Sequence, residues 1–107
     1  MTTTATAVPL PDVPLDVLEF AGEREATWRL RPVLNVTRTA FPNAPISLRI
    51  ADDPEIPNDR RIVVEVDVTG WSTDQMWQAR SRWSDLFAEV ASPVDTGVFR
   101  LRLAVRA

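Results

Sequence analysis

The sequence contains no cysteine, histidine, lysine or tyrosine. Without cysteine, the chain forms no disulfide, thiolate metal site or thiol nucleophile. Without histidine and lysine, it lacks the usual general base at neutral pH and the amine of Schiff-base chemistry, so a serine or threonine hydroxyl has no ordinary activating partner. Carboxylates are then the remaining groups for acid–base chemistry. We therefore expect a protein that is not an enzyme and that uses no cofactor.

All twelve positive side chains are arginines, because lysine is missing, and the formal net charge is −3. Neutralising phosphates needs a positive surface, so this balance argues against nucleic-acid binding. No apolar run approaches the roughly 20 residues that a membrane-spanning helix needs. Residues 1–15 also lack the basic start and the apolar block of a secretory signal. We expect a cytoplasmic protein that does not enter a membrane.

The length and composition indicate one small domain. A chain of 107 residues with 45% hydrophobic and 25% charged residues has the average composition of a folded domain and enough apolar surface for one core. Residues 1–13 combine a run of threonine and alanine with Pro9 and Pro11, a composition that favours an extended, flexible arm. The sequence therefore predicts an arm over residues 1–13 and a single domain over residues 14–107.

Two helices are predicted ahead of the first strand. Pro14 stands where a helix can begin, because its missing N–H would have no partner in the first turn, and Gly22 marks the end of that short helix. A second helix follows, with Pro32 in its first turn and Pro42 beyond its end. Its apolar side is predicted from the helical spacing and consists of Leu30, Val33, Leu34, Thr37 and Phe41.

Three segments alternate apolar and polar residues with the period that is typical of half-buried strands. They are residues 45–51, 61–69 and 98–107. Between the last two, Ser72 and Gln75 have the spacing of a helical capping box, and Trp71 can pack on Met76 as a hydrophobic staple. The helix that follows should cover the sheet with its apolar side, which includes Trp83.

The charges on the outward faces of these strands predict the order of the strands. Opposite charges on neighbouring strands stabilise a sheet, whereas like charges repel, so the acidic strand should be central. The residues are Arg49 in the first strand, Glu65 and Asp67 in the second, and Arg100 and Arg102 in the third. We predict an α+β fold of two N-terminal helices followed by β-β-α-β, with a three-stranded mixed sheet of order 1-2-3 and helices on one face. The first two strands should pair antiparallel and the last two parallel.

The loop between the first two strands is rich in carboxylates, and clustered carboxylates can bind a hard cation such as Ca²⁺ or Mg²⁺. The candidate ligands are Asp52, Asp53, Glu55 and Asp59. The same residues are the carboxylates available to an enzyme that uses an acid and a base as glycosidases do. The loop lacks the glycine and the ligand spacing of a calcium-binding loop, so we favour a polar turn whose acids face solvent or pair with Arg60 and Arg61.

The third helix carries a candidate binding surface for a partner. Trp77 points about 100° away from the sheet-facing side of this helix and begins a stripe of small residues. The stripe consists of Trp77, Ser81, Ser84 and Ala88. Either an N-terminal helix of the same chain covers it, or Trp77 is an aromatic anchor for a partner protein.

The outward arginines offer an alternative surface. They could receive the phosphates of a nucleic acid while a tryptophan stacks on bases, although acids among them weaken the field. These residues are Arg49, Arg100, Arg102 and Arg106.

We therefore expect a small non-catalytic module that acts by protein–protein contact, with another protein or a second copy of itself. The size, acidity and lack of catalytic groups fit a regulatory or accessory subunit of a bacterial complex, of the antitoxin or immunity type. The contact surfaces would be the Trp77 stripe, the N-terminal arm and the outer edges of the first and third strands, where an added strand can pair. The alternatives are a cation-binding or carboxylate-based enzyme at the acidic loop and a weak nucleic-acid-binding domain.

Overall fold

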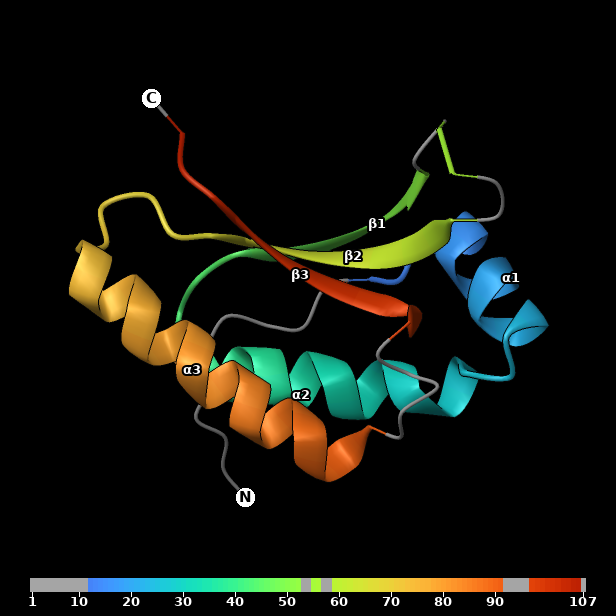
Figure 1. Ribbon diagram of the computed structural model, residues 1–107, viewed down its shortest axis with the longest axis horizontal. Coiled ribbons are helices and arrows are strands. Elements are labelled where there is room, and N and C mark those ends of the chain that lie inside the picture. Colours follow the sequence, from blue (N-terminus) through green and yellow to red (C-terminus); the bar gives the residue numbers. More distant parts are fainter. Residues whose placement is uncertain (1–11, 53–54, 57–58, 92–96, 107) are drawn as a thin grey trace, which may run out of the picture.

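A computed structural model describes residues 12–52, 55–56, 59–91 and 97–106. The elements follow in the order α1, η1, α2, β1, β2, α3 and β3 (Figure 1). Their bounds are Leu15–Glu23, Thr27–Arg29, Leu30–Ala40, Ile46–Asp52, Arg60–Asp67, Thr73–Val90 and Phe99–Ala104. The predicted helices and strands are thus confirmed. Most of the predicted arm lies outside the described residues, and its last residue, Val13, is half-buried and packs against the core.

The sheet has the predicted order β1-β2-β3. β1 pairs antiparallel with β2, and β2 pairs parallel with β3. The register places Glu65 of β2 between Ser47 of β1 and Arg102 of β3. The acidic strand is central, so each row of outward arginines has carboxylates beside it, as the charge argument requires.

α2 and α3 lie side by side against one face of the sheet, and α1 packs at its end beside β1 (Figure 1). Within the described residues, the other face of the sheet carries no helix, and we call it the open face. None of the helices in this part of the chain has the length and apolar character needed to cross a bilayer.

The core lies between the helices and the sheet. β2 contributes Ile62, Val64 and Val66, all fully buried, as its central position requires. Trp83 of α3 is 7% exposed and stacks on Phe87, with ring centroids 4.7 Å apart. These contacts confirm the predicted apolar side of α3.

Both ends of α3 are fixed by specific contacts. The Ser72 hydroxyl accepts from the Gln75 N–H at 3.1 Å, and the Gln75 side chain accepts from the Ser72 N–H at 2.8 Å, which confirms the capping box. At the other end, the guanidinium of Arg29 in η1 donates to the carbonyl of Val90. A cation at the carboxyl end of a helix also interacts favourably with the helix dipole. The direction of α3, and with it the position of its outer side, is therefore set by its two ends.

Candidate functional site

β3 is an edge strand, with backbone groups available along its outer side. The N–H of Ile62 donates to the carbonyl of Val98 at 2.7 Å, and the N–H of Val68 donates to that of Ala104 at 2.9 Å. Even-numbered residues of β3 therefore direct their peptide groups at β2, and the residues between them direct theirs away from the sheet. The outward-directed residues are Phe99, Leu101 and Leu103. In the described part of the chain, no strand pairs with this edge.

A hollow of about 510 Å³ lies between this edge strand and the first turns of α3. It is lined by Thr73, Met76, Trp77, Arg80 and Leu103. Met76 and Leu103 are half-buried, but Trp77 is 68% exposed. The hollow is thus a mainly apolar surface that opens to solvent beside backbone groups of β3 with which no described strand pairs.

The position of α2 shows whether this N-terminal helix covers Trp77. α2 packs on α3 through Thr37, whose hydroxyl accepts from the indole N–H of Trp83 at 2.9 Å. That contact lies on a different side of α3 from Trp77, so α2 leaves Trp77 uncovered. The rest of the predicted stripe is exposed as well, namely Ser81, Ser84 and Ala88. That these residues contact a partner stays a prediction.

The open face carries a charge pattern that continues to the edge of β3. Glu65 lies between Arg49 at 3.5 Å and Arg102 at 3.7 Å, and Asp67 pairs with Arg106 at 3.1 Å. Three of the four arginines predicted to receive phosphates therefore have carboxylate partners on the same face. The fourth, Arg100, is exposed and stands opposite Val63, with no ion pair among the described residues. Nucleic-acid binding through these residues stays a prediction.

The acidic loop forms ion pairs with arginine. Asp52 pairs with Arg60 at 3.0 Å, and Asp59 pairs with Arg61 at 3.0 Å, as the interpretation as a polar turn predicts. The bond to Asp52 raises the pKa of Arg60 above its usual value. Among the described residues, no three carboxylates gather closely enough to hold a metal ion, and Asp53 lies outside those residues. The four-carboxylate cation site therefore stays a prediction.

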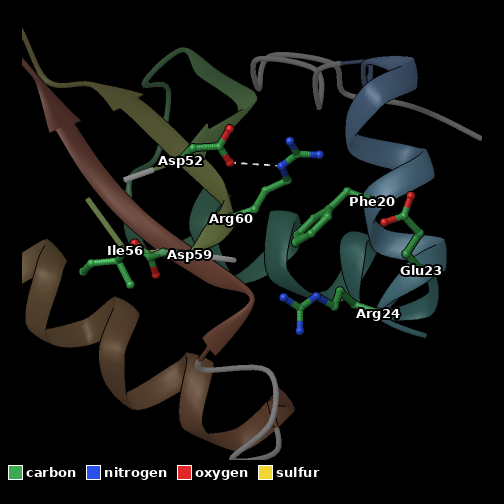
Figure 2. Close-up of a pocket in the computed structure, with 7 residues that line it drawn as sticks. All are labelled: Phe20, Glu23, Arg24, Asp52, Ile56, Asp59 and Arg60. Carbon is green, nitrogen blue, oxygen red and sulfur yellow. Dashed lines mark hydrogen bonds and ion pairs between the residues drawn. The ribbon is translucent and has the colours of Figure 1, made fainter. Parts of the chain in front are cut away.

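A second hollow, of about 450 Å³, lies between this hairpin and α1 (Figure 2). Its lining consists of Phe20, Glu23, Arg24, Asp52, Ile56, Asp59 and Arg60. Figure 2 shows Arg60 turned toward Asp52 beside the ring of Phe20. The Arg24 guanidinium also lies over that ring, 5.3 Å from its centroid. Five of the seven lining residues are charged, three acids and two arginines, so this hollow offers less to an apolar ligand than the one at Trp77.

Asp67, on the open face, makes the stability of the folded protein depend on pH. Its pKa lies below the usual value because the Thr69 hydroxyl donates to it at 2.6 Å and the Thr69 N–H at 3.0 Å, with Arg106 nearby. A lowered pKa in the folded state means that this stabilisation is present above the pKa of the unfolded chain, about 4 for aspartate, and is lost as the pH falls through the folded value. We expect the urea concentration at the unfolding midpoint to decrease as the pH is lowered below about 4.

The Asp67→Asn variant should show a smaller fall over the same pH range, because asparagine does not ionise. Asp85→Asn is the matched control, since Asp85 is an exposed carboxylate on α3. The measurement is urea unfolding from pH 7 to pH 2.5, with [urea] midpoints compared at each pH. Equal pH dependence in Asp67→Asn and the native protein would contradict this account.

The sequence indicated Trp77 and the free edge of β3, but not that Met76 and Leu103 join them in one surface. The helical spacing places Met76 on the apolar side of α3, and the alternation places Leu103 on the apolar side of β3, which favours burial of both. They are only half-buried because they lie at the outer margin of the α3–sheet contact. Comparison with known proteins gives no match to a family model, to a curated protein or to a solved structure.

Proposed function

We propose that this protein is a small non-catalytic module that binds another protein in the cytoplasm, as a regulatory or accessory subunit. The contact is made by the Trp77–β3 surface, which we define as Met76, Trp77, Arg80, Leu103 and the outer edge of β3. The observation that carries the proposal is the 68% exposure of Trp77 beside an apolar hollow.

An exposed tryptophan next to half-buried apolar side chains has the properties of an interface anchor. Tryptophan is enriched among residues that dominate binding energy, and such residues lie over pockets that the partner closes to water. Arg80 at the margin of the hollow adds a polar rim, which interfaces also have. Size, acidity and the absence of histidine, lysine and cysteine support an accessory role, of which an antitoxin- or immunity-type subunit of a bacterial complex is one example.

The other exposed aromatic residue supports this choice by contrast. Trp28 of η1 is 63% exposed, but the Arg29 guanidinium lies 3.6 Å from the centre of its ring. A cation over an indole face is a favourable contact within the chain. Trp28 thus already has a partner for one face of its ring, and it makes a matched control for Trp77.

Trp77→Ser should remove the binding of the partner and leave the protein folded. Loss of an interface anchor costs about 2 kcal/mol or more, which lowers affinity by about thirtyfold. The measurement is affinity capture from a lysate with immobilised native protein, Trp77→Ser and Trp28→Ser, followed by mass spectrometry. A stoichiometric protein retained by the native chain and Trp28→Ser, but lost with Trp77→Ser, is the expected result.

Thermal unfolding of the three proteins serves as the control. An exposed side chain contributes little to the core, so Trp77→Ser should unfold within a few degrees of the native protein. Capture that is equal for native protein and Trp77→Ser would show that the Trp77–β3 surface is not the contact.

A further inference from the structure

We infer that the Trp77–β3 surface takes an extended segment of the partner, which adds to the outer edge of β3 as a fourth strand and alternates acidic with apolar residues. This inference rests on the proposed function and specifies the chemistry of its partner. Three features of the surface select these properties independently: the backbone edge, the charges on the open face and the apolar hollow.

The backbone edge selects an extended segment. The peptide groups of alternate β3 residues face away from β2, so they can donate and accept along a regularly spaced row. Only another extended backbone matches that spacing over several residues, and strand addition to a free edge is a common mode of peptide recognition. A helix would satisfy its own peptide groups and leave this row unpaired.

The open face selects acidic residues at alternate positions. On its inner side β3 already pairs with a strand that places an acid opposite an arginine, because Glu65 of β2 stands opposite Arg102 and lies 3.7 Å from it. Glu65 also forms an ion pair with Arg49, so two guanidinium groups share one carboxylate. Arg100 stands opposite Val63 and forms no ion pair within the described residues, since the two acids that line a hollow with it, Asp52 and Asp59, pair with Arg60 and Arg61. A carboxylate on a fourth strand would therefore meet Arg100 and the exposed Arg102 from the outer side.

The helix side of the edge selects apolar residues between the acids. Successive side chains of a strand alternate between the two faces of a sheet, so residues flanking the acids point toward α3. There the hollow of about 510 Å³ presents Met76, Trp77 and Leu103. Apolar side chains of the fourth strand would fill this hollow and cover the Trp77 ring.

The same charges disfavour a second copy of this chain as the occupant. Two β3 strands that pair antiparallel with their apolar residues on the helix side bring arginines opposite arginines near the middle of the strand, at Arg100 and Arg102. Like charges directly opposite each other destabilise a sheet. We therefore assign the site to a different protein segment that carries the acids.

The test uses a labelled peptide of roughly ten residues in which valine and glutamate alternate, long enough to span one strand. Fluorescence anisotropy measures its binding to the full chain. A peptide with the same alternation of valine and lysine is the control, and we expect it to bind at least about tenfold more weakly, because it places cations against the arginine row. Equal binding of the two peptides would overturn the inference.

Arg100→Glu should reverse this preference. The variant removes an arginine that has no ion pair in the described chain and places an acid at the edge, so the valine–lysine peptide should gain affinity and the valine–glutamate peptide should lose it. Arg31→Glu, at an exposed position on α2 rather than on the sheet, makes the same change in net charge and should leave both affinities unchanged. An unchanged preference in Arg100→Glu counts against the charge argument.

N-methylation of the valine–glutamate peptide tests strand addition itself. An added strand uses the peptide groups of alternate residues, so methylating either all valines or all glutamates should abolish binding in one case and preserve it in the other. Binding that survives both patterns, or is lost with both, would overturn the fourth strand.

Competition separates failure of this inference from failure of the proposed function. Excess valine–glutamate peptide should displace the captured partner from the native chain. A partner that is lost with Trp77→Ser but not displaced by the peptide would overturn strand addition and leave the proposed function standing. If Trp77→Ser changes neither capture nor peptide binding, the proposed function itself is wrong.

Discussion

Replacing Trp83 with alanine is expected to lower the free energy of unfolding by about 3–5 kcal/mol. The indole is 7% exposed, stacks on Phe87, and reaches α2 through its hydrogen bond to Thr37. Its removal opens a cavity at the contact between the two helices that support the sheet. A domain of this kind has a free energy of unfolding of about 5–15 kcal/mol, so this loss removes a large part of its stability. Urea unfolding followed by circular dichroism measures the change.

A double-mutant cycle separates the hydrogen bond from the packing. The Thr37 hydroxyl is fully buried, donates to the Val33 carbonyl at 2.7 Å and accepts from Trp83. Thr37→Val leaves the indole N–H buried without its acceptor, which costs about 1–3 kcal/mol. Trp83→Phe removes the donor and keeps an aromatic ring.

The double variant should then destabilise the protein by about 1 kcal/mol less than the sum of the two single variants, because it has no indole N–H to be left buried without an acceptor, as happens in Thr37→Val alone. Additive losses would show that the hydrogen bond does not contribute to stability. A Trp83→Ala variant as stable as the native protein would contradict the position of Trp83 in the core.

Local patterns predicted most of the fold because each pattern has one physical cause. Alternation in β2 follows from burial of one face, and the Ser72–Gln75 pair satisfies backbone groups at the start of α3. The strand order followed from the outward charges, since only a central acidic strand places carboxylates beside the arginines on both sides. These features depend on neighbours in the sequence or on the sign of a charge.

Val63 shows where pattern alone is insufficient. Alternation places it on the outward face with Glu65 and Asp67, yet it is only 2% exposed. In the register it lies between Arg49 and Arg100. Arginine has a long aliphatic stem that can cover an apolar neighbour while its charged end stays in water. The alternation predicts the face on which Val63 lies, but its burial depends on the arginine side chains of β1 and β3.

The candidate site depended on tertiary packing in the same way. The helical spacing located Trp77 away from the sheet, but two arrangements of the N-terminal helices were consistent with it. The outcome depends on the side of α3 that α2 occupies, which the bond between Thr37 and Trp83 marks. Those residues are 46 positions apart, so no local period reveals their contact. The free edge of β3, by contrast, follows directly from the predicted strand order.

Phe41→Ala is expected to lower the free energy of unfolding by about 3–5 kcal/mol as well. Phe41 directly follows α2, its side chain is completely buried, and its ring centroid lies 5.7 Å from that of Trp71. Trp71 stands immediately before the cap of α3. The Phe41 ring therefore joins the end of α2 to the start of α3, and its loss removes both core volume and the support of Trp71.

The near-ultraviolet circular dichroism of the aromatic residues should change in Phe41→Ala even where the far-ultraviolet signal still shows a folded chain, because Trp71 loses its aromatic neighbour. Phe41→Leu is the matched control: it loses the aromatic contact but refills most of the space, so its midpoint in urea should fall less. A similar fall for leucine and alanine would mean that the contact with Trp71, rather than the cavity, dominates the loss. An unchanged midpoint in Phe41→Ala would contradict the packing of α2 against the start of α3, on which the exposed position of Trp77 depends.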